Sequence, residues 1–454
     1  MNPLLATLVA IVANLLAGLT ALRSTRGEAR ASALTGAVVT LGAAGFCALP
    51  LLIHGESIHM ALAGVPLRAD ALTGTLLLPL GLAVGGLAVA LPRQHALPRV
   101  MAAASFALAA VELALVADAL ALLVFAELAS GLAVAWGLGA VRRRDAGEGR
   151  AAMGYLALSG VLALGALVLA ASRGEAFRSL GAVAPVELDL AALLLGAAML
   201  RLGVMPLHTG LVSAMQGRPA GRAALLAVPL GAVVTVIRVV QPAMTSTTWG
   251  VALLAVAAAA ALLALAAQDL GRSAGWTLAA MHGLLLAGTA EPAPVGAVGG
   301  ALLWAALILS EVGFVLAIVM VVQRLGAVDL RRLHGLQLAA PRLSLAFLLV
   351  VLTLSGAPGT LEFVAEDLLL HGASSRGLVG TALAVITIAL VGFNALRLYV
   401  RVFYGPSDPS RVDMDARRWE QGVLLALVAL LMAGGVAPGL LPIVARAAAS
   451  AVGG

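Results

Sequence analysis

Five ionisable residues lie inside long apolar stretches of this sequence, where a charge is expensive to keep. They are Glu127, Arg201, His282, Glu311 and Glu366. An ionisable side chain at bilayer depth costs at least about 3 kcal/mol, so it usually faces a protein interior or a wet cavity and marks a transport path. Carboxyl and imidazole groups exchange protons, whereas a guanidinium hardly releases its own. The set predicts movement of protons or cations, with Arg201 setting the local field.

Two of these residues stand beside helix-breaking sequences. Pro206 follows Arg201 by five positions, and Gly356, Pro358 and Gly359 come shortly before Glu366. A proline inside a helix frees a backbone carbonyl one turn back. In a membrane such a break is tolerated only where neighbouring groups or water satisfy the freed backbone. We therefore expect interrupted helices at Pro206 and Pro358, each next to a buried charge.

Three positions leave two interpretations open, and a fourth is a secondary candidate. Glu112 is either a lateral relay group or an interfacial residue tolerated by packing, and Asp367 is a secondary candidate beside Glu366. Arg238 either snorkels to the interface, with its stem in apolar surroundings, or takes part in a relay. His282 is either a satisfied core residue or a group that titrates near physiological pH.

The elements that position these residues are predicted from composition. The chain has 454 residues, of which 62% are hydrophobic and 11% charged, and its mean hydropathy is +1.06. No soluble globular composition approaches these values, so we expect an all-α polytopic membrane protein. About 20 apolar residues suffice to span a bilayer. About fourteen such segments can be counted, near residues 2–22, 32–53, 71–91, 97–116, 118–140, 151–172, 188–209, 219–240, 249–267, 273–290, 295–322, 343–370, 377–402 and 421–445.

The single cysteine, Cys47, lies in the second predicted span and is interpreted as a small buried hydrophobe. One cysteine excludes disulfides, cysteine-ligated iron–sulfur clusters and cysteine-based zinc sites within this chain. The sequence also has no flavin, quinone, nucleotide or metal motif. We therefore expect no cofactor, no metal and no catalytic centre here, and any driving chemistry should belong to partner subunits.

The net charge of +6 follows membrane topology rather than nucleic-acid binding. All 28 basic residues are arginines, and 21 of them fall in the odd-numbered loops between the predicted spans or at their edges. Three more are Arg201, Arg238 and Arg446, and the even-numbered loops hold the remaining four, Arg68, Arg173, Arg178 and Arg376. By the positive-inside rule the odd loops are cytoplasmic. Both termini then face outward from a bacterial-type cytoplasmic membrane.

The two interrupted spans are the seventh and the twelfth, five spans apart. Five is odd, so they run in opposite senses across the membrane, which indicates an inverted-topology repeat. We expect scaffold helices 1–3 in residues 1–95 and a first five-helix repeat, helices 4–8, in 96–241. The second repeat, helices 9–13, is expected in 242–403, and the last helix in 404–454.

Spans four to thirteen resemble the antiporter-like, proton-pumping membrane subunits of respiratory complex I, multi-subunit cation/proton antiporters and membrane-bound hydrogenases. Phe125-Ala-Glu127 is similar to the fifth-helix glutamate motif, and Arg201 with Met205-Pro-Leu-His-Thr209 to the seventh-helix motif. Asp269 to Gly283 and Asp329 to Leu336 match in order. Gly356-Ala-Pro-Gly-Thr360 with Phe363-Val-Ala-Glu366 resembles the twelfth helix, and Glu366 falls on its terminal Lys-or-Glu position.

Three positions differ from the family pattern that this resemblance implies. Arg201 replaces a lysine in the seventh helix, Leu226 stands at the eighth-helix histidine position, and Glu311 stands at the eleventh-helix lysine position. The resemblance implies partners among other membrane subunits and a soluble or redox module. The parent would then be a multi-subunit assembly such as an NADH-quinone oxidoreductase.

Three functions remain open from the sequence. The first is a proton-conducting subunit whose two half-channels meet at the central ionisable line, with Glu127 and Arg201 as an ion pair. The second is a sodium/proton antiporter subunit, in which carboxylates and freed carbonyls hold a cation, since hard ions prefer oxygen ligands. The third is a non-conducting structural subunit that keeps the fold for assembly, including one in a bicarbonate-uptake complex.

The arginine asymmetry makes the topology testable. With Cys47 replaced by Ser, a membrane-impermeant maleimide added to intact cells should fail to label Arg143→Cys, because that turn is expected in the cytoplasm. Ser57→Cys, in the predicted outer hairpin, should be labelled. Labelling at position 143 would mean that the topology is inverted and the span count wrong.

Overall fold

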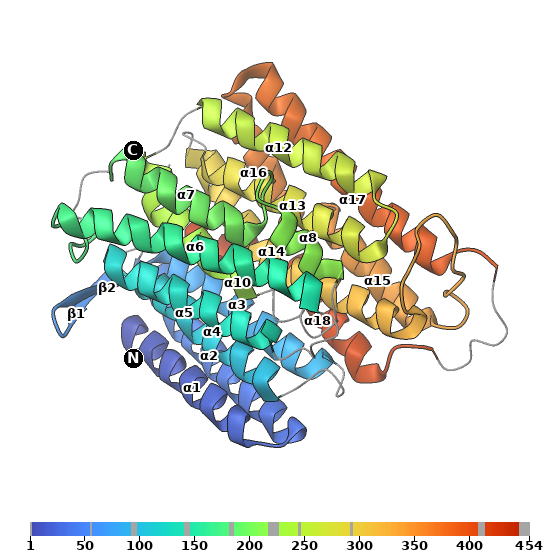
Figure 1. Ribbon diagram of the computed structural model, residues 1–454, viewed down its shortest axis with the longest axis horizontal. Coiled ribbons are helices and arrows are strands. Elements are labelled where there is room, and N and C mark those ends of the chain that lie inside the picture. Colours follow the sequence, from blue (N-terminus) through green and yellow to red (C-terminus); the bar gives the residue numbers. More distant parts are fainter. Residues whose placement is uncertain are drawn as a thin grey trace.

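The computed structural model describes residues 2–54, 57–91, 98–139, 146–180, 186–216, 227–243, 247–290, 294–406 and 414–444. Within these ranges the chain is a bundle of helices with one short β-hairpin (Figure 1). Ten of the described helices are long and apolar enough to cross a membrane. The predicted inner turn at 140–145 and the position Leu226 lie outside the described residues.

The N-terminal part consists of three long helices and the hairpin. Helices α1 (Pro3–Arg23) and α2 (Arg26–His54) lie along one edge of the bundle, and α3 (Ala71–Ala90) packs behind them (Figure 1). Strands β1 (Ile58–Leu62) and β2 (Val65–Ala69) pair antiparallel, with Ile58 opposite Ala69. Asp70 then caps α3 by accepting from the backbone N–H of Thr73, at 3.1 Å.

The first predicted repeat begins with α4 (Pro98–Val116), α5 (Leu120–Gly139) and α6 (Ala146–Ser172). Two short helices follow, α7 (Leu188–Leu202) and α8 (Thr209–Gln216). The last element starts as α10 (Ala227–Thr235), becomes the π-helical segment η2 (Val236–Val240) and ends as α11 (Gln241–Ala243).

The second predicted repeat has a similar order of helices, although its last element is a single long helix. It comprises α12 (Thr247–Ala266), α13 (Leu270–Thr289), α14 (Pro294–Leu325), the short pair α15 (Pro341–Leu354) and α16 (Leu361–Ser374), and α17 (Gly377–Phe403). Helix α18 (Arg418–Val436) and the short 3₁₀-helix η3 (Pro438–Leu440) follow. In both halves the fourth element is a pair of short helices, at the position where a break was predicted.

Ten of the fourteen predicted spans correspond to helices of membrane length. The other four are represented by α13 and by the shorter segments α7–α8, α10–α11 and α15–α16. The number fourteen, the inversion of the repeats and the boundaries at 95, 241 and 403 stay predictions.

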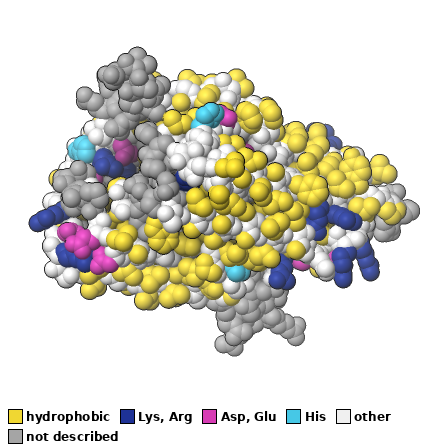
Figure 2. Space-filling view, turned by 90° about the horizontal axis from the view of Figure 1, so that it is seen from above, with side chains coloured by type: hydrophobic (Ala, Val, Ile, Leu, Met, Phe, Trp, Pro, Cys, Tyr) yellow, Lys and Arg dark blue, Asp and Glu magenta, His cyan; other side chains and the backbone are white. Residues whose placement is uncertain are grey.

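Helix α14 forms the centre of the bundle. Of its most apolar stretch 94% is buried inside the protein, against 28% for α6 and for α18. It packs against α3, α13, α15, α16 and α18 (Figure 1). Figure 2 shows apolar side chains covering the middle of the visible face, with arginines toward its two ends. Such an extended apolar surface suits a lipid environment, and the chain is an integral membrane protein.

Helices α13 and α14 cross where neither carries a side chain. A Cβ atom added at Gly300 of α14 would lie 2.8 Å from the carbonyl carbon of Gly288 in α13. Backbone atoms cannot move aside as the end of a flexible side chain can. Glycine at this crossing therefore sets the distance between the two helices that carry His282 and Glu311.

Gly300→Ala should destabilise the purified protein by about 1–3 kcal/mol, because the added methyl group overpacks a backbone contact. Thermal unfolding in detergent, followed by tryptophan fluorescence, measures the change. Gly165→Ala in α6 is the matched control, since no atom lies within 4 Å of its added Cβ. Alanine there should be neutral or slightly stabilising. Equal melting temperatures for both variants would contradict the close crossing.

Candidate functional site: a buried line of ionisable residues

Arg201 is buried among three helices and is fully engaged by hydrogen bonds. Its Nε donates to the hydroxyl of Ser159 on α6 and its Nη1 to the hydroxyl of Ser130 on α5, each at 3.0 Å. Its Nη2 donates to the backbone carbonyl of Glu127 at 2.5 Å. A Cβ at position 131 would lie 2.8 Å from Nη2, so Gly131 leaves the room that this approach requires. The planar fork of an arginine suits such a divided set of acceptors.

Glu127 and Arg201 lie together, but not as the direct ion pair expected from the sequence. The guanidinium bonds to the main-chain carbonyl of Glu127, while the carboxylate accepts a hydrogen bond from the hydroxyl of Thr235 at the end of α10. The two opposite charges remain close enough to attract each other. The difference arises because Ser130, Ser159 and a carbonyl already satisfy the donors of Arg201.

The first break lies directly after Arg201. Helix α7 ends at Leu202, and Gly203 follows with φ +64°, a left-handed conformation that favours glycine. Residues 203–208, including Pro206, are not helical, and α8 begins at Thr209. The carbonyl of Leu202 is left without its helical partner. It lies 2.5 Å from Nδ1 of His282 on α13, so the imidazole fills the position vacated by the helix.

His282 connects this break to α14. Its Nε2 lies 2.7 Å from Oε1 of Glu311, and both side chains are nearly inaccessible to solvent. The contact has the distance of an ion pair but not the angles of a hydrogen bond. Since Nδ1 faces a carbonyl, it carries a hydrogen, and Nε2 is the nitrogen that faces Glu311. The titrating interpretation of His282 stays a prediction.

The second break holds Glu366. Helix α15 ends at Leu354, Gly356 and Gly359 have φ +63° and +91°, and Pro358 lies between these two glycines. Helix α16 then starts at Leu361, after the cap Thr360. A Cβ atom at Gly356 would lie 2.1 Å from Oε2 of Glu366, so the carboxyl group rests directly on the backbone of the break.

We call the buried ionisable residues Glu127, Arg201, His282, Glu311 and Glu366 the line. One further buried carboxyl group beside them was not assigned from the sequence. Glu362 lies one turn before Glu366 on α16 and is completely buried. Neither of its oxygens has a hydrogen-bond partner among the described residues. Its polar neighbours are Ser310, adjacent to Glu311 on α14, and Glu366. The i, i+4 spacing of Glu362 and Glu366 was the signal available, because such residues share a helix face.

Two of the secondary candidates lie apart from this line, and both are buried. Glu112 on α4 faces α1 and α2, where it accepts hydrogen bonds from Asn14 at 3.1 Å and Thr40 at 2.5 Å. Arg238 is bonded to Asp70 and to backbone carbonyls, and its side chain is 2% exposed. Its guanidinium is thus bonded within the protein, and the choice between the two interpretations of Arg238 stays a prediction.

Asp367 points away from the line. Its side chain is 56% exposed and lies 3.7 Å from His371, one turn further on α16. Glu366, its neighbour in sequence, is buried. Successive helical residues are about 100° apart around the axis, so the two carboxylates of the pair cannot both face α14.

Comparison with known proteins shows which family this chain belongs to. The family model described as "NADH:quinone oxidoreductase/Mrp antiporter, TM" matches residues 117–391, more than half of the chain. The chain belongs to this family. The matched region contains all five residues of the predicted line and both helix breaks.

Among curated relatives of this antiporter family member, NADH-quinone oxidoreductase subunit 13 of Thermus thermophilus is 30% identical over 179 residues. That alignment covers 39% of this chain and 38% of the relative, so it spans little more than a third of either protein. NADH-quinone oxidoreductase subunit N 2 of Syntrophobacter fumaroxidans is 27% identical over 332 residues, covering 68% of this chain and 70% of the relative.

Solved structures share the fold over nearly the whole length. A chain of the Mrp complex from Dietzia sp. DQ12-45-1b superposes with a TM-score of 0.85 at 19% identity, covering 98% of this chain and 96% of that one. A chain of respiratory complex I from Thermus thermophilus gives 0.78 at 21% identity, covering 99% and 100%. The predicted all-α fold of antiporter-like subunits is confirmed.

The contact between the Glu366 carboxyl group and the backbone of Gly356 can be tested by substitution of the glycine. Gly356→Ala should lower the free energy of unfolding by about 1–2 kcal/mol, because alanine is strained at positive φ. Its methyl group should also displace the Glu366 carboxyl. Thermal unfolding measures the first effect, and mass-spectrometric labelling of Glu366 by a hydrophobic carbodiimide measures the second.

Gly422→Ala in α18 is the control, since it has open space around its added Cβ. Unchanged stability and unchanged Glu366 labelling in Gly356→Ala would show that the break has another backbone conformation.

Proposed function

We propose that this chain is a proton-conducting, antiporter-like subunit of a multi-subunit membrane complex related to complex I. The observation that carries the proposal is the set of buried ionisable groups on α5, α7, α13, α14 and α16. Buried charge is costly to keep without use, and the set adjoins two helix breaks whose freed backbone groups can be solvated. Its members, with Glu362 added, are Glu127, Arg201, His282, Glu311, Glu362 and Glu366.

The central exchange takes place between His282 and Glu311. With Nδ1–H held by the carbonyl of Leu202, a proton enters or leaves the imidazole at Nε2, 2.7 Å from the Glu311 carboxyl. Arg201 stays charged and supplies a fixed positive field. A change in the Glu127–Arg201 region alters that field at the neighbouring α7 terminus, and therefore the proton affinity of His282.

The exit end consists of two carboxyl groups one turn apart. Glu362 and Glu366 are both buried, and like charges at this spacing cannot both ionise in an apolar setting. They therefore share protons, and a proton delivered by Glu311 displaces one toward the break at Pro358. Coupling to a distant reaction requires that partner subunits bias one of these groups.

The proposal extends to the partners of the subunit and to its membrane and orientation. The partners are other membrane subunits together with a soluble or redox module, as the multi-subunit complexes among the structural neighbours suggest. The subunit sits in a bacterial-type cytoplasmic membrane with both termini outside, as the arginine distribution indicates. Within it, the two predicted repeats supply the two half-channels.

A sodium/proton antiporter subunit is the second candidate. Glu362 favours it, because its two oxygens lack hydrogen-bond partners among the described residues. A hard cation prefers such oxygens together with the carbonyls of a helix break. Proton flux measured with and without sodium separates the two candidates.

Glu366→Gln should abolish proton flux through the assembled complex, because the amide keeps the shape of the side chain and removes its titration. Flux is measured in proteoliposomes with a pH-sensitive dye, and assembly by copurification of the subunits. Asp367→Asn makes the same chemical change one residue away, on the exposed face, and should conduct normally.

Arg201→Lys is the third variant to be tested, after Glu366→Gln and Asp367→Asn. It keeps the charge and adds a group that can release a proton, so flux should persist. Wild-type flux in an assembled Glu366→Gln complex would rule out this route and favour a structural subunit.

A further inference from the structure

A second buried ion cluster lies beside the line rather than in it. Arg238 of η2 donates from Nη1 to the carbonyl of Ala117 and from Nη2 to the carbonyl of Leu115, each at 2.5 Å. Nη2 also lies 3.3 Å from the carboxylate of Asp70, the cap of α3. We call Arg238, Asp70 and these two carbonyls the Arg238 clamp. It fastens η2 to the end of α4 and the start of α3.

Further charged residues contact Asp70, the acidic member of the clamp, directly or through Arg68. Arg68 of β2 bonds to Asp70 at 3.1 Å and approaches Asp118 at 3.6 Å. Asp118 accepts a hydrogen bond from Ser179 at 2.5 Å and lies 3.8 Å from the exposed His59. The hairpin, the α4–α5 connection and the loop after α6 thus meet at Asp118, and Arg68 joins Asp118 to Asp70. The proposed proton line uses none of these groups.

The clamp is one turn from the proton line. Thr235, the last residue of α10, donates its hydroxyl to the Glu127 carboxylate, and Arg238 follows three positions later. Between them the helix changes from α to π, a feature that occurs often at functional sites. The position of the Thr235 hydroxyl therefore depends on how η2 is held.

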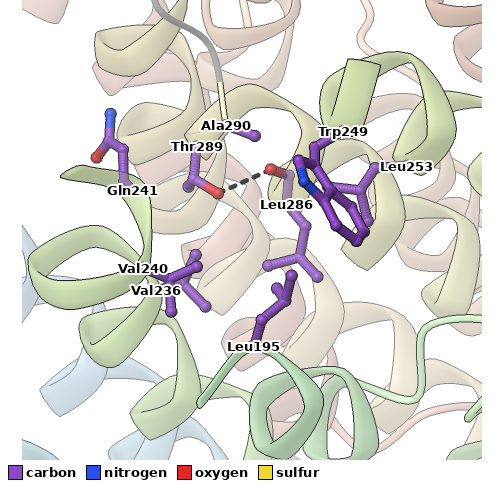
Figure 3. Close-up of a pocket in the computed structure, with 9 residues that line it drawn as sticks. All are labelled: Leu195, Val236, Val240, Gln241, Trp249, Leu253, Leu286, Thr289 and Ala290. Atoms are coloured by element: carbon purple, nitrogen blue, oxygen red, sulfur yellow. Dashed lines mark hydrogen bonds between the residues drawn. The ribbon is translucent and has the colours of Figure 1, made fainter. Parts of the chain in front are cut away.

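The opposite side of η2 packs mainly through apolar side chains. Val236 and Val240 are buried, and they border a small cavity of about 20 Å³ that is also lined by Leu195 and by side chains of α11, α12 and α13 (Figure 3). Most of this lining is apolar, although Figure 3 also shows Gln241 and Thr289 there. Apolar contacts are not directional, so the hydrogen bonds of Arg238 are the contacts that fix the orientation of η2.

We propose that the Arg238 clamp is a positioning device that holds the Thr235 hydroxyl against Glu127. This inference rests on the proposed function only in giving Glu127 a part in proton movement. Releasing Arg238 lets η2 shift toward the cavity and withdraws the hydroxyl from the carboxylate. Asp70, Arg68 and Asp118 thereby connect the hairpin end of the bundle to the first member of the proton line.

The test measures the Glu127–Thr235 contact without using transport. Dicyclohexylcarbodiimide modifies protonated carboxyl groups in apolar surroundings, and mass spectrometry of the intact complex after digestion reports each site. Loss of one hydroxyl donor to the carboxylate favours its acid form. Thr235→Val should therefore raise Glu127 labelling at fixed pH by about fivefold, the factor that corresponds to one hydrogen bond.

Arg238→Gln should raise Glu127 labelling to a similar extent, and the double variant should exceed neither single one. Two changes that act through one contact do not add. Thr235→Ser keeps the hydroxyl and should restore wild-type labelling. Labelling of Glu366 should stay constant in all variants. Arg173→Gln, which removes an exposed arginine paired with Asp189, is the matched control and should change nothing.

Wild-type Glu127 labelling in Arg238→Gln, alongside increased labelling in Thr235→Val, would overturn the proposal, as would additive effects in the double variant. If Arg238→Gln does not accumulate, Asp70→Asn replaces it, because the amide oxygen still caps Thr73 while the charge facing Arg238 is lost. Failure of the proposed function would appear separately, as normal proton flux in Glu366→Gln.

Discussion

The burial of one guanidinium organises the centre of this protein. Arg201 is 4% exposed, so its donors must find acceptors on neighbouring helices, and they do so on α5 and α6. Both serine partners are themselves anchored, Ser130 to the Glu127 carbonyl and Ser159 to the Ala197 carbonyl. An unpaired charge at this depth would cost far more than any single packing contact. The relative placement of three helices therefore follows from satisfying one side chain.

The two helix breaks solve a related problem for the backbone. Each break uses glycine at positive φ to leave the helix, and each brings a titratable side chain to the backbone so exposed. At the first break the imidazole of His282 comes from another helix. At the second, Glu366 comes from the helix that follows. Similar breaks thus expose backbone groups beside Arg201 and beside Glu366, and different side chains contact them.

The sequence predicted the helical membrane fold and the burial of Glu127, Arg201, His282, Glu311 and Glu366, because both depend on rules that act locally. Charge inside an apolar run identified Glu127, Arg201 and Glu311 without knowledge of their partners. What failed depends on helix phase and on distant contacts. A break resets the helical phase, so the sequence could not decide which acidic residue after Pro358 faces inward, and Glu362 was passed over while Asp367 was included. Likewise, the carboxylate that pairs with Arg238 belongs to Asp70, which follows the hairpin and is far from Arg238 in sequence.

The central position of α14 has a consequence for electrical insulation. A protein that moves protons across a membrane must also prevent their passive leakage, and any lipid-facing or solvent-facing carboxylate offers a leak. Glu311 is carried by α14, the most enclosed of the ten described helices that are long and apolar enough to cross a membrane, and is itself 4% exposed. The surrounding helices place Glu311 in a medium of low dielectric constant. Under the proposed function, much of the membrane voltage would fall between His282 and Glu362, and a proton crossing this step would do most of its electrical work there.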